Sequence, residues 1–130
     1  MSDVLVDSSV WIDYLRDDVR AVQKLEPLMA ARRIAISGPI YAEVVSGAKH
    51  RSTFDRVAFL LRSLRWIAPP PLAWEQIAEV RFGLARQGTQ SNLIDLLIAV
   101  TALHAGHSVL TRDRDFSFIA RVLPVEIDLF

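Results

Sequence analysis

The chain has 130 residues with 15 basic and 15 acidic side chains, and its formal net charge of +0 argues against a generally basic nucleic-acid-binding surface. That length predicts one domain over residues 1–130, large enough to bury about two-thirds of its unfolded surface. Cysteine is absent, which excludes disulfides and thiolate metal sites. The longest apolar run, residues 96–103, is far shorter than the roughly 20 residues of a membrane span, so we expect a cytoplasmic protein without membrane association.

The N-terminal segment predicts a buried strand that ends in an acid. Residues 4–6 are continuously apolar, as in a strand covered on both faces, and residues 10–15 have the apolar spacing of a helix. Ser8 or Ser9 is the expected N-cap of that helix, so Asp7 lies at a strand-to-helix turn. Ligands of open α/β sheets bind beyond the carboxyl ends of strands, so we expect Asp7 to point into a site.

The second strand–helix unit follows a helix predicted over residues 19–31. Asp17 or Asp18 is the expected cap of that helix, and Pro27 is expected to kink or break it. Residues 34–36 predict the second buried strand. In the next helix, residues 39–48, Glu43 is the one acid among apolar neighbours and therefore a second candidate; the alternative is an ordinary solvated glutamate.

Ser37 or Gly38 is expected to cap this helix, with Pro39 at its first position. Ser52 and Asp55 then resemble a capping box that opens another amphipathic helix. Residues 66–68 predict a third short strand, residues 69–71 are a stiff proline connector, and residues 72–86 predict an amphipathic helix.

A third acid lies near the start of the most apolar helix of the chain. Asn92 is the predicted N-cap of a helix over residues 93–105, and Gly106 is its predicted end. Asp95 is the only acid in that segment. It is either a site residue or a carboxylate favoured by the helix dipole in the first turn.

A fourth acid follows a second strand that resembles the first. Residues 108–111 predict a strand ending in a hydroxyl, and Asp113 and Asp115 come directly after it. One of these two acids is expected to be the N-cap of a short helix. Residues 125–127 predict a last edge strand.

Asp7, Glu43, Asp95 and Asp113 occupy two strand ends and two helix starts, which converge at one edge of a parallel sheet. Carboxylates that meet there repel one another, so the cluster needs bound cations or shared protons. Oxygen-only donors favour Mg²⁺, with Mn²⁺ as a substitute. Such ions serve the hydrolysis of phosphodiesters by an activated water, which is the chemistry we expect.

Four segments resemble the motifs of PIN-domain ribonucleases, in particular VapC-type toxins of bacterial toxin–antitoxin pairs: residues 7–15 (DSSVWIDYL), Glu43, residues 95–99 (DLLIA) and residues 110–116 (LTRDRDF). The resemblance covers the whole chain. It implies an α/β fold, a PIN-like three-layer α/β/α sandwich around a mostly parallel sheet of four to five short strands. It also implies a catalytic and metal-binding quartet of Asp7, Glu43, Asp95 and Asp113, with Asp115, Ser8 and Thr111 as auxiliary pocket residues.

The same resemblance implies partners. These are a second copy in a homodimer, an antitoxin whose extended basic tail blocks the acidic site, and structured RNA such as tRNA or rRNA, whose cleavage inhibits translation. Arg112 and Arg114 flank Asp113, where we expect them to steer substrate phosphate; the alternative is that they only offset repulsion among the acids. Apolar faces within residues 10–29 and 54–64 are either the antitoxin groove or ordinary core.

Two other functions remain as alternatives. An aspartyl phosphotransferase would use Asp7 as a nucleophile, but such enzymes usually need an acid two residues later, where this chain has Ser9, and a suitably placed lysine. A non-catalytic PIN-like module that binds protein or RNA is expected to lack at least one acid of the quartet.

Overall fold

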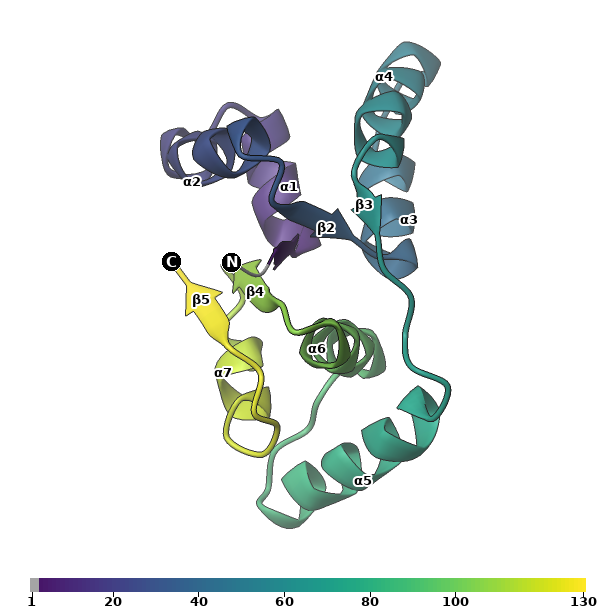
Figure 1. The fold of residues 1–130 in the computed structure, drawn as a ribbon, viewed down its shortest axis with the longest axis vertical. Helices are drawn as coiled ribbons and strands as arrows, with labels where there is room; N and C mark the ends of the chain where they lie inside the picture. The colour runs from purple at the N-terminus through teal and green to yellow at the C-terminus, as the bar shows by residue number, and fades with distance from the viewer. Residues whose placement is uncertain (1–2) are drawn as a thin grey trace.

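A five-stranded parallel sheet forms the centre of the computed structural model, which describes residues 3–130 (Figure 1). The spatial order is β3-β2-β1-β4-β5, and all four neighbouring pairs are parallel. The strands are β1 (Val4–Val6), β2 (Ile34–Ile36), β3 (Arg65–Trp66), β4 (Ser108–Thr111) and β5 (Ile127–Leu129). The predicted sheet of four to five mostly parallel strands is confirmed.

Two groups of helices cover the sheet, and the predicted α/β/α sandwich is confirmed. The first group packs together and contains α1 (Ser8–Leu15), α2 (Val19–Ala30), α3 (Gly38–Ser46) and α4 (Arg51–Arg62). The second group contains α5 (Ala73–Arg86), α6 (Leu93–Ala105) and α7 (Asp115–Ile119). Figure 1 shows β2 and β4 between α1 on one side and α6 on the other. No helix within residues 3–130 combines the length and apolar character that crossing a membrane requires.

The path of the chain across the sheet changes direction beside β1. The strands β2 and β3 follow on one side of β1, whereas β4 and β5 lie on its other side. Because crossovers between parallel strands are right-handed, the two directions place their helices on opposite faces. The gap between β1 and β4 is therefore the switch point at which open α/β sheets bind ligands, and it lies beside Asp7 and Thr111.

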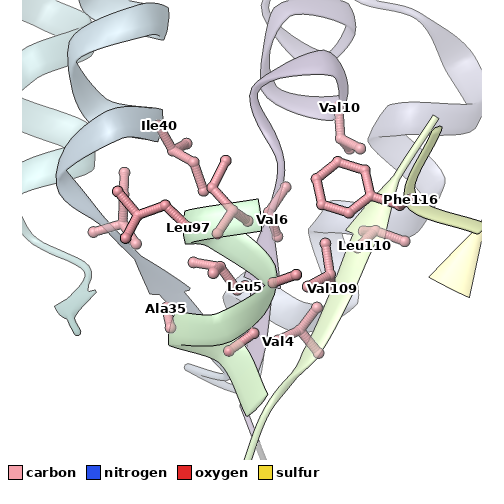
Figure 2. Close-up of a cluster of buried hydrophobic side chains, with 14 of the residues drawn as sticks. Val4, Leu5, Val6, Val10, Ala35, Ile40, Leu97, Val109, Leu110 and Phe116 are labelled. Atoms are coloured by element: carbon pink, nitrogen blue, oxygen red, sulfur yellow. The ribbon is translucent and has the colours of Figure 1, made fainter. Parts of the chain in front are cut away.

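The inner strands are apolar because helices cover both of their faces. Leu5, Val6 and Val109 are fully buried, with Leu97 of α6 and Val10 of α1 packed in the same cluster (Figure 2). Each such side chain contributes roughly 1.5–3 kcal/mol when it is fully buried. The core therefore fixes the two strands that carry the candidate site.

Two helices begin earlier than predicted. The N-cap of α1 is Asp7 rather than either of the serines that follow it, and its side chain makes no capping hydrogen bond. The N-cap of α4 is His50, so Ser52 lies inside the helix and the predicted capping box is wrong. In both cases the helix extends over residues whose side chains had suggested its start.

The predicted start of α2 and the predicted end of α6 are confirmed, whereas the predictions for two prolines differ from the structure. Asp18 accepts a hydrogen bond from the Ala21 N–H at 3.0 Å, and Gly106 ends α6 in the left-handed conformation with φ 74°. Pro27, where a kink or a break was predicted, lies inside α2 and does not break it. Ser37 is the N-cap of α3, which places Pro39 at the second helical position rather than the first.

The two edge strands are shifted from their predicted positions. The strand β3 is Arg65–Trp66 instead of residues 66–68, and β5 is Ile127–Leu129 instead of residues 125–127. Both β3 residues are exposed, and β5 is exposed at two of its three positions. Burial specifies strand register only weakly at such edges, which explains why the apolar pattern misplaced both strands.

Candidate active site

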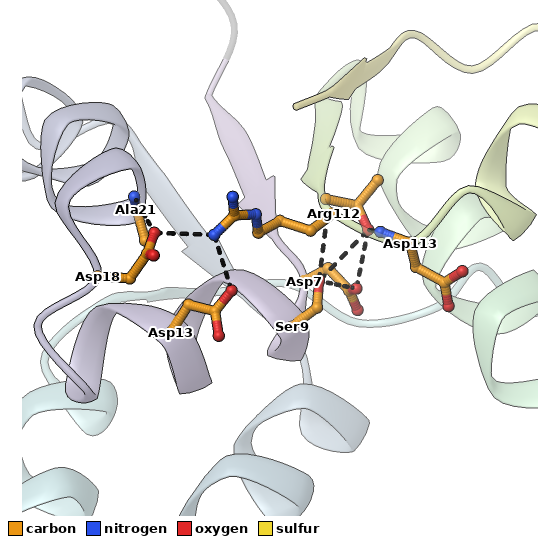
Figure 3. Close-up of polar contacts among 8 residues, drawn as sticks. Asp7, Ser9, Asp13, Asp18, Ala21, Arg112 and Asp113 are labelled. Atoms are coloured by element: carbon orange, nitrogen blue, oxygen red, sulfur yellow. Dashed lines mark hydrogen bonds and ion pairs between the residues drawn. The ribbon is translucent and has the colours of Figure 1, made fainter.

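Asp7 is the buried anchor of the site. Its backbone N–H donates to the Leu110 carbonyl at 2.9 Å, and the residue is only 4% exposed. Its Oδ2 accepts hydrogen bonds from Ser9 Oγ at 2.8 Å and from Thr111 Oγ1 at 3.0 Å (Figure 3). Burial raises the pKa of the Asp7 carboxyl group, and the two hydroxyl groups offset only part of that rise.

The hydroxyl group that reaches Asp7 from α1 belongs to Ser9, whereas the sequence pointed to Ser8. The N-cap of α1 is Asp7, one or two residues before the predicted Ser8 or Ser9, and both serines therefore lie inside the helix. Ser9 Oγ also accepts a hydrogen bond from the Arg112 N–H at 3.2 Å, so it ties α1 to the turn after β4. Ser8 is buried, and its backbone N–H lowers the pKa of Asp7.

A chain of hydrogen bonds shapes the turn between β4 and α7. Thr111 Oγ1 accepts from the Asp113 N–H at 2.9 Å, and Asp113 Oδ1 accepts from the Asp115 N–H at 2.9 Å. Neither acid is the N-cap of α7, which is the exposed Arg114, although Asp113 makes a bond of the capping kind. The turn thus presents Asp113 and Asp115 close together.

The structure brings Asp95 to these two acids. Asp95, Asp113 and Asp115 each offer one carboxylate oxygen, and the three oxygens lie within 4.8 Å of one another. Asn92 caps α6 through the Ile94 N–H at 2.7 Å, which places Asp95 in the first turn of that helix.

Burial is the main reason that the pKa of Asp95 rises to about 7. The charges of Asp7, Asp113, Asp115 and Glu43 raise it further, in that order of effect. All four predicted acids and the auxiliary Asp115 therefore share one electrostatic neighbourhood.

Glu43 is the most peripheral of the predicted quartet. It is exposed on α3, yet its charge raises the pKa of both Asp7 and Asp95. The salt bridges recorded for residues 3–130 include none to Asp7, Glu43, Asp95, Asp113 or Asp115. No lysine or arginine among residues 3–130 therefore neutralises the cluster.

Arg112 does not lie beside the acid cluster as the sequence suggested. Its Nη1 donates to Asp13 at 2.9 Å and to Asp18 at 2.8 Å, and Figure 3 shows its guanidinium and the Asp113 carboxylate pointing to opposite sides. The pairing of Asp13 with Arg112 was not among the contacts expected from the sequence. The available signal was a lone acid between Val10 and Leu15 of an otherwise apolar helix face.

The donor set fits a hard divalent cation. All the groups that converge are oxygens, either carboxylates or hydroxyls, and the carboxylates are close enough to raise the pKa of Asp95. A cation among them would relieve that repulsion. Ser9 donates a hydrogen bond to Asp7 from the position where an aspartyl phosphotransferase needs its second acid, which disfavours that alternative.

Comparison with known proteins identifies the class to which this arrangement belongs. The PIN domain family model matches residues 4–122. Ribonuclease VapC11 of Mycobacterium tuberculosis is 30% identical over 132 residues, covering 98% of both chains. Ribonuclease VapC6 of the same species is 32% identical over 103 residues, covering 77% of this chain and 81% of the relative.

Solved structures show the same fold. VapBC2 from Rickettsia felis, bound to a promoter DNA fragment, aligns with a TM-score of 0.78 at 21% identity and covers 98% of both chains. VapBC-5 from Mycobacterium tuberculosis aligns with a TM-score of 0.75 at 24% identity over 100% of both chains. The chain belongs to the PIN-domain family and, within it, to the VapC-type toxins.

Proposed function

We propose that the chain is a Mg²⁺-dependent endoribonuclease, able to use Mn²⁺ instead, and the toxin of a toxin–antitoxin pair. The observation that carries the proposal is the cluster of Asp95, Asp113 and Asp115, which no basic side chain in the described part of the chain neutralises. Its relatives VapC11 and VapC6 are named ribonucleases, which supports the nuclease activity.

The quartet would hold the cation, with Asp115 as an auxiliary ligand. Ser9 and Thr111 both donate to Oδ2 of Asp7, so neither uses Oδ1, which is then available as a ligand. A bound divalent ion lowers the pKa of an attacking water and stabilises the leaving oxygen of the phosphodiester.

The raised pKa of Asp95 predicts how metal affinity depends on pH. With its pKa raised to about 7, its carboxyl group is half protonated near neutral pH when no cation is present. Cation binding would release that proton, so metal affinity should rise with pH.

The proposed substrate is structured RNA, tRNA or rRNA, whose cleavage would inhibit translation. Arg114 is exposed beside the acid cluster and is our candidate for contact with substrate phosphate. A homodimer is proposed as the working assembly. None of these steps requires Arg112 to touch RNA.

The proposed protein partner is an antitoxin. A groove between α1, α3 and α4 is lined by Ile12, Leu15, Val44 and Val57, which offers an apolar surface for a partner segment. A basic tail continuing from that segment would be attracted to the acid cluster, since an unpaired anionic site binds arginine or lysine well. The VapBC assemblies among the structural neighbours support this partner.

Cleavage of mixed cellular RNA tests the proposal. Wild type and Asp7→Asn are each incubated with Mg²⁺, Mn²⁺ or EDTA, with Asp55→Asn as the control because Asp55 is exposed and pairs only with Arg51 at 3.7 Å. Metal-dependent fragments from wild type and Asp55→Asn, absent with Asp7→Asn or EDTA, are expected. Mn²⁺ binding without cleavage of any RNA would instead favour the non-catalytic binding module.

A further inference from the structure

Arg112 is a cation in the turn that carries the acid cluster, but it makes its ion pairs elsewhere. We propose that it is a positioning residue, which fixes the turn after β4 and keeps its own charge away from the acids, so that Asp113 is free to hold a divalent cation. The proposal rests on the metal-dependent nuclease function proposed above.

Two carboxylates from different elements hold the guanidinium. Nη1 lies 2.9 Å from Asp13 Oδ2 on α1 and 2.8 Å from Asp18 Oδ2 at the start of α2, and the arginine side chain is only 24% exposed. The Arg112 N–H adds a bond of 3.2 Å to Ser9 Oγ. Charge-assisted hydrogen bonds of this length are the strong kind, so the side chain has a defined position.

The end of the described chain adds a third contact. The Arg112 guanidinium carbon lies 4.7 Å from the ring centroid of Phe130, and the Phe130 N–H donates to the Thr111 carbonyl at 3.2 Å. The ring of Phe130, one residue beyond β5, therefore covers the guanidinium, and the Phe130 backbone holds the end of β4. Together these contacts fix the residue that precedes Asp113 on both its side chain and its backbone.

The direction of the Arg112 side chain also decides which carboxylates its positive charge neutralises. A free guanidinium one residue from Asp113 would pair with the acid cluster and compete with a metal ion. Asp13 and Asp18 supply two negative charges for this one positive charge. Arg112 therefore neutralises none of the acids that would bind the cation.

A measurement of Mn²⁺ affinity separates a positioning role from a simple effect of charge, because the two predict opposite changes in affinity when Arg112 is replaced. Removing a nearby positive charge should tighten Mn²⁺ binding if charge alone matters. If Arg112 positions the turn, Arg112→Gln should weaken Mn²⁺ binding by about 10- to 100-fold, as loss of an outer-shell contact does at metal sites.

The experiment titrates Mn²⁺ alone into the full chain and follows binding by calorimetry. The proteins are wild type, Arg112→Gln, Arg112→Lys and Asp13→Asn, with RNA cleavage kinetics measured in parallel. Arg51→Gln is the matched control, since Arg51 also has an ion pair, to Asp55 at 3.7 Å, and a stacked ring, Phe54 at 4.6 Å. The expected result is weaker Mn²⁺ binding and lower kcat with Arg112→Gln and Asp13→Asn, partial recovery with lysine, and no change in the control.

Equal or tighter Mn²⁺ binding by Arg112→Gln would overturn the proposal, and a raised KM for RNA in the same variant would favour direct phosphate contact instead. If circular dichroism shows that Arg112→Gln is unfolded, Asp13→Asn decides, and an unchanged Mn²⁺ affinity there also overturns it. A wild type that binds no Mn²⁺ would refute the metal-dependent function itself. Failure of the function and failure of the positioning role are thus distinguishable.

Discussion

Two groups of carboxylates lie on opposite sides of the turn after β4. Within residues 3–130, only one of the two groups is paired with a basic side chain, that of Arg112. Asp13 and Asp18 share the guanidinium of Arg112. Asp95, Asp113 and Asp115 converge within 4.8 Å without an ion pair to any described basic side chain. The first group is neutralised by the protein, and the second is left for an external cation.

Asp18 and Asp95, one acid from each group, have pKa values shifted in opposite directions. The Ala21 N–H lowers the pKa of Asp18, with Arg112 adding to that effect, whereas burial and neighbouring carboxylates raise the pKa of Asp95 to about 7. Acids that look alike in the sequence thus have different costs of ionisation. The unneutralised group is where function is expected.

The largest expected loss of RNA cleavage follows from removing one acid of the unneutralised group. Asp95→Asn should reduce RNA cleavage by roughly 100-fold or more, because it removes a proposed metal ligand and leaves the other acids in place. Initial rates in saturating Mg²⁺ measure this loss. Cleavage within threefold of wild type would show that Asp95 only stabilises its helix.

The same substitution should stabilise the metal-free protein. Because the folded-state pKa of Asp95 is raised to about 7, the native state retains a proton that the unfolded chain has lost, and stability falls as pH rises from about 4 to 7. In EDTA at pH 7.5, Asp95→Asn should therefore gain about 2 kcal/mol after allowance for solvent screening.

Urea unfolding from pH 4 to 8 measures this difference, which should disappear near pH 4. A loss of stability at pH 7.5 would indicate that the Asp95 carboxylate stabilises the N-terminus of α6 instead.

Removing either hydroxyl group that holds Asp7 should lower RNA cleavage by a smaller factor. Thr111→Val removes hydrogen bonds to Asp7 and Asp113 while nearly conserving volume, and Ser9→Ala removes those to Asp7 and Arg112. Each should lower kcat by about 10-fold, as changes to groups that orient metal ligands do. Ser8→Ala is the control and should retain activity; an equal loss there would contradict the assignment to Ser9.

The smallest effect on stability is expected at Asp18. Because the pKa of Asp18 is lowered in the folded state, its contribution to stability is present above the unfolded pKa of about 3.9 and is lost as pH falls through the folded value. Asp18→Ala should thus lower Tm by a few degrees at pH 7, and by progressively less as the pH falls below about 3.9. Asp18→Asn, which keeps a capping oxygen, should lose less, and a greater loss in Asp18→Asn would refute the capping role.

Local sequence signals were sufficient for the inner part of the fold. The apolar runs of β1, β2 and β4 and the caps at Asp18 and Asn92 lie where the sequence placed them, because burial and capping are encoded by neighbouring residues. The approach of Asp95 to Asp113 also followed from topology, since strand ends and helix starts converge at one edge of the sheet, whereas Asp7 and Glu43 are not among the three carboxylates that lie within 4.8 Å of one another. The exposed edges β3 and β5 lack a burial pattern and were misplaced.

The direction of long side chains was not predictable. Arg112 pairs with acids 99 and 94 residues away, and nothing next to it in the sequence distinguishes those acids from Asp113. The choice of Ser9 over Ser8 as the hydroxyl group beside Asp7 depends on the helix geometry of α1, whose start the sequence did not fix. Both depend on tertiary packing that the sequence pattern does not specify.

The most direct test of the central claim is a calorimetric titration of Mn²⁺ into wild type, Asp95→Asn and Asp55→Asn at pH 7.5. If the unneutralised carboxylates form the metal site, wild type and Asp55→Asn will bind Mn²⁺ saturably, and Asp95→Asn will bind at least about 10-fold more weakly. Equal affinity in all three proteins, or no saturable binding by wild type, would contradict the account.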